Sequence, residues 1–188
     1  MELIDNGLDS LKRCIHDLKE AADLNASDRN YNYTIKDTII SLHHSIETLF
    51  KYLISKKAPY LIYDDINKYF KFEVEKKWNN SLKQDLNTIQ FLDAVHCVLT
   101  IYEINMDKIV YTKIIKLNQD RNALTHYTMS FEHRVVENYI TLLLPDLFKI
   151  FNIHIEEFEK FAKNNKFYEE IDSLQKDKFK MLTGITCF

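Results

Sequence analysis

Glycine and proline are scarce in this chain, with two of each among 188 residues. Strand-rich folds use glycine at tight turns, and phosphate-binding loops use it where the backbone must approach a ligand closely. Gly7 and Gly184 are too far apart to build a glycine-rich phosphate loop. We therefore expect long helices joined by few tight turns, in a chain long enough to bury a core as one domain.

Composition narrows the class of protein further. A hydrophobic fraction of 46% with 28% charged residues is typical of a folded chain, and the net charge of −3 predicts no general attraction to nucleic acid. Cys14, Cys97 and Cys187 are odd in number and form no CxxC pair, which favours a reducing compartment over a disulfide framework or a zinc site. No apolar run approaches the ~18 residues that cross a bilayer. We expect a cytoplasmic protein with no membrane contact and no cofactor.

Apolar residues recur at helical spacing along most of the chain. The first stripe comprises Ile4, Leu8, Leu11, Ile15, Leu18 and Ala22. Helices are expected at 4–22, 37–57 and 88–102, from 106 onward, from 131 past 151 with a kink at Pro145, and at 164–182. Residues 25–34 are expected to form a loop, and residues 60–86 short helices and loop. The prediction is an all-α bundle of about five helices over 1–160, with a helical extension or tail over 161–188.

A short polar insert, "DRNALTHY" (120–127), follows the fourth long helix. The apolar stripe of that helix continues from Leu117 to positions 121 and 124, so it predicts Arg121 on the apolar face. A charge there is costly unless a partner or a bound anion compensates it. On one continuous helix His126 would point about 140° away from Arg121. The two side chains converge only if the helix ends between them or if they meet across a symmetric subunit interface.

Arginine and histidine together suit metal-independent cleavage of RNA. Arg121 suits bidentate contact with a phosphate and stabilisation of its transition state, and His126 suits proton transfer near neutral pH. Asn122 is expected to orient one of them or to donate to a phosphate oxygen. A local basic strip for RNA binding is expected from Lys108, Lys113 and Lys116.

The segment "RNALTHY" (121–127) resembles the Arg-Asn-x-x-x-His motif of HEPN-domain proteins, and "SLHHSIETLFKYLI" (41–54) resembles the second helix of that family. In that helix a Glu is followed four residues later by a Lys, here Glu47 and Lys51. The resemblance covers residues 1–160. It implies a helical bundle that forms a homodimer, in which two motifs meet at one composite, metal-independent ribonuclease site. Such proteins are typically toxins of toxin–antitoxin pairs or antiphage effectors.

The resemblance also assigns roles to single residues. Arg121 and His126 carry over as catalytic, and Asn122 as their supporting residue. An antitoxin or another regulatory protein is implied as a further partner. In the branch neutralised by a nucleotidyltransferase antitoxin a tyrosine follows the histidine by two residues, whereas Tyr127 follows by one, which puts modification by such a partner in doubt.

Other interpretations stay open beside this one. Arg121 can instead cap a helix C-terminus, with His126 an ordinary loop histidine, in a non-catalytic dimerisation or nucleotide-binding module. Glu47 is a weaker candidate for orienting Arg121. His43 is expected to be buried and hydrogen-bonded, or to reach the composite site as a supporting residue. A metal site at His43 and Glu47 is not expected, because no Glu-x-x-His motif supplies further ligands.

Two further features have structural explanations. His96 falls on the predicted stripe of its helix, so we expect a hydrogen-bonded core histidine. The aromatic residues between Tyr60 and Trp78 are expected to serve core or interface packing rather than base stacking, because no basic face accompanies them.

Overall fold

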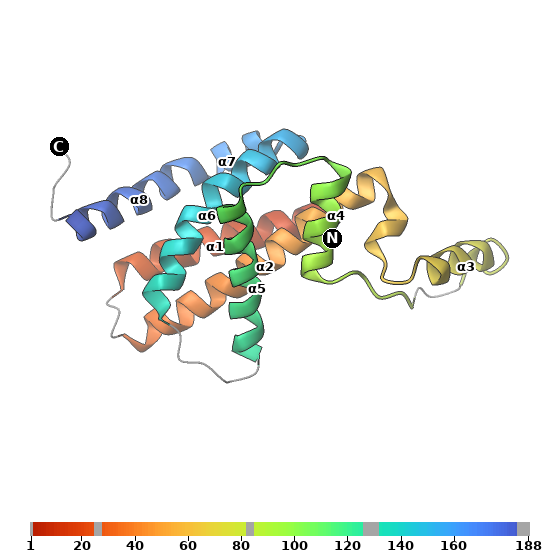
Figure 1. The fold of residues 1–188 in the computed structure, drawn as a ribbon, viewed down its shortest axis with the longest axis horizontal. Coiled ribbons are helices and arrows are strands. Elements are labelled where there is room, and N and C mark those ends of the chain that lie inside the picture. The colour runs from red at the N-terminus through yellow and green to blue at the C-terminus, as the bar shows by residue number, and fades with distance from the viewer. Residues whose placement is uncertain (1, 25–27, 82–84, 126–131, 184–188) are drawn as a thin grey trace.

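The structure is a computed structural model, which describes residues 2–24, 28–81, 85–125 and 132–183 (Figure 1). The described part of the chain is all-helical, as expected, apart from one isolated bridge between Tyr63 and Thr88. Its elements in chain order are α1 (Leu3–Asp23), α2 (Arg29–Lys57), the 3₁₀-helix η1 (Pro59–Ile62), α3 (Ile66–Lys76), α4 (Phe91–Ile101), α5 (Lys108–Thr125), α6 (His133–His154), α7 (Phe158–Asn164) and α8 (Phe167–Thr183). Most of these helices pack into one body, and α3 extends from it (Figure 1).

The central element is α2, which packs against α1, α4, α5 and α6. Its contact with α1 is the most extensive in the molecule. Because neighbours surround it, apolar residues are buried around much of its circumference rather than on one stripe. They are Tyr31, Ile35, Ile39, Leu42, Ile46, Leu49, Phe50, Leu53 and Ile54.

The start of α2 corrects one expectation. Residues 29–34 are helical, although the polar composition of 25–34 predicts a loop. The side chain of Asp28 caps the helix by accepting a hydrogen bond from the backbone N–H of Asn30 at 2.8 Å. Tyr31 and Thr34 are buried, so tertiary contacts stabilise a first turn that lacks local apolar periodicity.

Proline 145 lies inside α6, and the helix continues through it. Proline cannot donate the usual hydrogen bond to the carbonyl four residues earlier, that of Thr141. The side-chain amide of Gln175 on α8 donates to this carbonyl at 3.4 Å. Glu132 is the N-cap residue of this helix, and its side chain makes no capping hydrogen bond.

The core includes the C-terminal helix. Phe167, Ile171 and Leu174 of α8 are buried in the same cluster as the apolar residues of α1, α2 and α6. Cys14 lies in this core, and its burial raises the pKa of its thiol. Cys97 is partly buried, and like Cys14 it forms no disulfide bond. Cys187 lies outside the described residues.

The register of α4 differs from the expected one. Its buried residues are Phe91, Ala94, Val95 and Val98. His96, expected in the core, is exposed, and its Nε2 atom lies 2.8 Å from the hydroxyl of Tyr111 on α5. The buried face of α4 therefore includes Val95 in place of its neighbour His96. The reason is that α2 packs against Phe91, on which His43 stacks.

No helix in the described ranges is long and apolar enough to span a membrane.

Candidate functional site at the end of α5

The last turns of α5 place two adjacent residues in opposite environments. Asp120 is 5% exposed, whereas Arg121 is exposed. After Leu117 the next buried residue of α5 is Asp120, so the buried face of the helix advances by three residues here rather than by four. The prediction that Arg121 lies on the apolar face is therefore wrong. Its guanidinium is available to solvent, and Nη1 donates to the side-chain oxygen of Asn122 at 3.1 Å.

Asp120 is held by two donors. The hydroxyl of Tyr139 on α6 donates to Oδ2 at 2.8 Å, and Nζ of Lys116 donates to Oδ1 at 2.8 Å. Burial, followed by the nearby charge of Asp120, raises the pKa of the Tyr139 hydroxyl, so this group stays protonated and keeps donating. These contacts join the end of α5 to α6 and give each oxygen of the buried carboxylate a hydrogen-bond donor.

His43 of α2 lies under the end of α5, close to Asn118. It is 5% exposed, its ring stacks on Phe91 at 3.9 Å between centroids, and Nε2 donates to Oδ1 of Asn118 at 3.1 Å. Burial lowers the pKa of His43, outweighing the opposite effect of its hydrogen bond to Asn118. The ring is therefore neutral at pH 7 and positions Asn118, in agreement with the expected buried and hydrogen-bonded histidine.

Glu47, one turn along α2, pairs with Lys51. Nζ of Lys51 donates to Oε1 of Glu47 at 2.5 Å and to the hydroxyl of Thr88 at 2.9 Å. The other carboxylate oxygen of Glu47 lies 3.9 Å from Nδ1 of His43, beyond hydrogen-bond distance. The structure thus places Glu47 beside His43 and Lys51, and its hydrogen bond goes to Lys51 rather than to Arg121.

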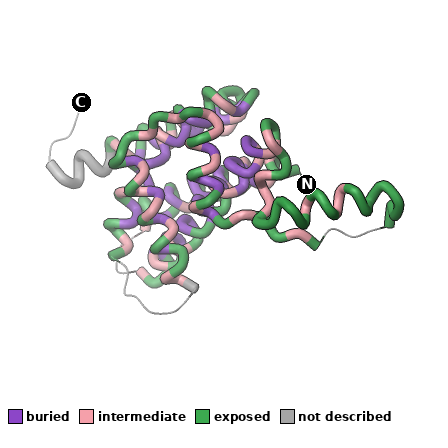
Figure 2. The backbone as a smooth tube through the Cα atoms, turned by 45° about the vertical axis from the view of Figure 1, so that its right-hand side comes forward, coloured by how far each residue is buried: buried purple, intermediate pink, exposed green. Residues whose placement is uncertain are grey.

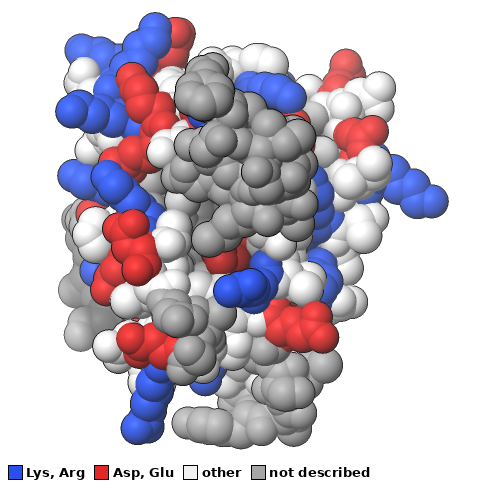
Figure 3. Space-filling view, turned by 90° about the vertical axis from the view of Figure 1, so that its left-hand side faces the viewer, with Lys and Arg blue, Asp and Glu red and all other residues white. Residues whose placement is uncertain are grey.

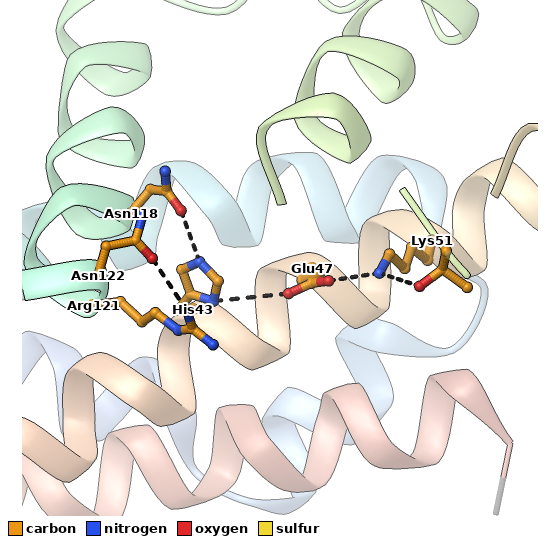
Figure 4. A network of polar contacts seen from close by, with 7 residues as sticks. His43, Glu47, Lys51, Asn118, Arg121 and Asn122 are labelled. Carbon is orange, nitrogen blue, oxygen red and sulfur yellow. Dashed lines mark hydrogen bonds and ion pairs between the residues drawn. The ribbon is translucent and has the colours of Figure 1, made fainter. Parts of the chain in front are cut away.

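Figure 4 shows these contacts as one line of polar groups along α2 that reaches α5 at one end. The line runs from Thr88 through Lys51 and Glu47 to His43, and then across to Asn118 of α5. Arg121 and Asn122 lie next to its far end. The site therefore consists of an exposed guanidinium and amide on α5, supported from below by a buried histidine on α2.

Several predicted site residues are not brought together. His126 and Tyr127 lie outside the described residues, and α5 ends at Thr125, directly before them. Lys108 begins α5, thirteen residues before Arg121, which is about 20 Å along a helix axis. Lys113 is about 12 Å away by the same measure, and Lys116 pairs with Asp120. On the face shown in Figure 3, basic and acidic side chains are interspersed rather than segregated.

Sequence reasoning missed Asn118 and Asp120, the two α5 residues with the clearest structural roles. Both depend on partners from other helices, His43 and Tyr139, which no local spacing reveals.

A group of possible metal ligands occurs elsewhere. His16, Asp17 and Glu20 of α1 bring ligand atoms within 4.8 Å of one another. His16 and Asp17 line an open groove between α1 and α2, together with Lys12, Arg13 and two further carboxylates, those of Asp9 and Asp37. Lys12 and Arg13 place two positive charges beside these three possible ligands, and this does not favour the binding of a metal ion.

Comparison of the chain with protein-family models, curated proteins and solved structures finds no match.

Proposed function

We propose that the protein is a metal-independent RNA endonuclease of toxin or antiphage-defence type, acting at a composite site in a homodimer. The observation that carries the proposal is the state of Arg121. Its guanidinium is exposed at the end of α5, beside the amide of Asn122, and no carboxylate among the described residues forms an ion pair with it. An arginine with its charge uncompensated on a supported helix end is suited to a phosphate.

The reaction assigns one task to each residue. The 2′-hydroxyl of a ribose attacks the adjacent phosphorus, its proton passes to a base, and the bond from phosphorus to the 5′-oxygen breaks as that oxygen takes up a proton. His126, five residues after Arg121, is the proposed proton carrier, supplied by one or both protomers. Arg121 stabilises the charge that develops on the phosphoryl oxygens, and Asn122 donates to them.

The hydrogen bonds between α5 and its neighbouring helices serve to position Arg121 and Asn122. His43 holds Asn118, one turn before Asn122, and Tyr139 and Lys116 hold Asp120. These contacts fix the last turns of α5 against α2 and α6, so Arg121 stands on a rigid element. Lys113 is proposed to contact a neighbouring phosphate, and an antitoxin or regulatory protein to restrain the activity.

The test incubates a labelled single-stranded RNA with wild type, His126→Ala and Arg121→Ala in EDTA, followed by analysis of the product ends. We expect cleavage that leaves 2′,3′-cyclic phosphate and 5′-hydroxyl ends, reduced at least ~100-fold in either variant. His16→Ala and Arg29→Ala, exposed residues on α1 and α2, serve as matched controls that retain activity. Circular dichroism verifies that each variant is folded.

Cleavage by His126→Ala at the wild-type rate contradicts the proposed mechanism. If wild type does not cut RNA, two alternatives make separate predictions. An interaction module predicts that Arg121→Ala dissociates or destabilises the protein. A nucleotide-binding module predicts a rise in melting temperature when a nucleotide is added.

A further inference from the structure

The open groove between α1 and α2 is lined by charged side chains of both signs. Buried residues of the helical body lie in its interior, and exposed residues lie along the outer faces of its helices, where this groove is found (Figure 2). The groove has a volume of about 540 Å³, which is within the range of small-molecule sites. Its lining residues are Asp9, Lys12, Arg13, His16 and Asp17 of α1 and Asp37, Ile40 and Ser41 of α2.

The charges on the α1 side follow one another in a fixed order along the groove. Asp9 is followed one turn later by Lys12 and Arg13, and Asp17 comes one turn after Arg13. Intervals of three and four residues keep these side chains on one face of the helix. The α1 side therefore presents a negative, a positive and a second negative region to whatever occupies the groove.

The α2 side adds to the second negative region. α1 and α2 run antiparallel: Gly7, early in α1, approaches Leu49, late in α2, and the charge of Asp37, early in α2, acts on Asp17 (Figure 1). Burial raises the pKa of Asp17, and the charge of Asp37 raises it further. Ile40, one turn after Asp37, lies closer to the two cations and is 50% exposed. It forms an apolar surface between the two cations and the second negative region.

These charges are not compensated by one another. Among the described residues no ion pair joins Lys12 or Arg13 to a carboxylate, although three carboxylates line the same groove. Asp17 is 15% exposed, and its Oδ2 atom is buried without a hydrogen-bond partner in the described part of the chain. A buried carboxylate oxygen without a donor is costly and requires an explanation. A positive charge bound beside Asp17 compensates that cost.

A basic amino acid carries charges that match all three regions. We propose that the groove binds a free basic amino acid of the arginine or lysine type. Its α-ammonium group lies at Asp9, and its α-carboxylate lies at Lys12 and Arg13, where the guanidinium suits bidentate contact. The cation of its side chain lies between Asp17 and Asp37. Arg13 and Asp17 are ~6 Å apart along the helix axis, a distance that a side chain of the length of lysine or arginine spans.

The charge balance distinguishes this ligand from other classes. With His16 neutral, the two cations and three carboxylates leave the lining with a net charge of −1, which a basic amino acid of charge +1 balances. A mononucleotide adds negative charge, and a neutral amino acid leaves the second negative region unmatched. For a small ligand in an open groove we expect a dissociation constant of ~0.1–1 mM. The inference does not depend on the proposed nuclease activity.

Isothermal titration calorimetry with L-arginine tests the negative region, at ~50 mM salt because salt screens exposed charges. We expect Asp17→Asn and Asp37→Asn each to raise the dissociation constant at least ~tenfold. Asp23→Asn removes the same charge from an exposed position of α1 and is the matched control, expected to bind like wild type. Circular dichroism verifies folding, and Asp37, which is exposed, keeps the test decisive if Asp17→Asn does not fold.

Agmatine, which is arginine without its carboxylate, tests the positive region. We expect it to bind wild type at least ~tenfold more weakly than L-arginine, because it brings no anion to the two cations. Arg13→Gln should change the preference in opposite directions: L-arginine binds more weakly, whereas agmatine, of charge +2, binds more tightly to a lining that now carries −2. Lys160→Gln, an exposed change on α7, is the matched control.

Several results would overturn the inference. They are a failure of L-arginine and L-lysine to bind at ~20 mM, unchanged binding by Asp17→Asn and Asp37→Asn, and an equal loss of both ligands in Arg13→Gln. Tighter binding of adenosine monophosphate or of Mn²⁺ than of L-arginine would also overturn it. RNA cleavage is measured separately, so failure of this proposal is distinguishable from failure of the proposed nuclease.

Discussion

At the scale of single residues, the end of α5 separates a structural side chain from an available one. Asp120 is buried between Lys116 and Tyr139, and Arg121 is exposed. Removing Asp120 leaves the hydroxyl of the partly buried Tyr139 without its acceptor, a loss that typically costs ~1–3 kcal/mol. Removing Arg121 takes away an exposed charge whose hydrogen bond goes to the adjacent residue.

We therefore predict that Asp120→Ala lowers the free energy of unfolding by ~1–3 kcal/mol, while Arg121→Ala changes it by less than ~0.5 kcal/mol. Urea denaturation followed by circular dichroism measures both. A comparable loss in Arg121→Ala would instead support the interaction module, in which Arg121 is a structural residue.

The same pair of residues shows where sequence reasoning reaches its limit. Helical periodicity allows the core position after Leu117 to be either 120 or 121, because both three- and four-residue steps stay on one face. Hydrophobicity does not decide between an aspartate and an arginine. The choice is made by Tyr139, whose hydroxyl donates to Asp120 from a helix that begins thirteen residues after that aspartate. The polar motif was visible in the sequence, but its orientation was not.

At the scale of elements, the contact between α1 and α2 depends on the one glycine within α1. An ideal Cβ atom on Gly7 would lie 2.7 Å from Cγ and Cδ2 of Leu49 and 3.3 Å from its backbone nitrogen. Leu49 is fully buried and cannot move aside freely. Gly7 thus allows the two helices to approach closely. The extents of both helices, apart from the first turns of α2, were predictable from periodicity alone.

Gly7→Ala is predicted to destabilise the protein by ~1–3 kcal/mol, although alanine favours a helix by up to ~1 kcal/mol over glycine. Thermal denaturation measures the change, and Asp9→Ala, at an exposed position of α1, controls for helix propensity. In the double variant Gly7→Ala/Leu49→Ala the clash is removed, so its loss should be smaller than the sum of the single losses. Simple additivity, or a stabilised Gly7→Ala, would show that the helices separate without cost.

At the scale of the whole molecule, the sequence predicted a C-terminal helical stripe but not what it packs against. Phe167, Ile171 and Leu174 recur at helical spacing, which is equally compatible with a separate extension over 161–188 and with a helix that completes the bundle. In the structure α8 packs on α1 and α6, and Phe167 lies among Phe148 and Phe161 at 6.0 and 5.5 Å between centroids. Such long-range contacts leave no local trace in the chain.

Phe167→Ala therefore tests whether α8 and the bundle form one cooperative unit. Truncating a fully buried phenylalanine costs ~3–5 kcal/mol, so we predict a single unfolding transition shifted by ~6–20 °C to lower temperature. Glu169→Ala, on the exposed side of the same helix, should leave the transition unchanged. An extension that folds separately would behave differently: Phe167→Ala would remove a small part of the helical signal at low temperature and leave the main transition at its wild-type midpoint, because the core of α1, α2 and α6 would not depend on α8.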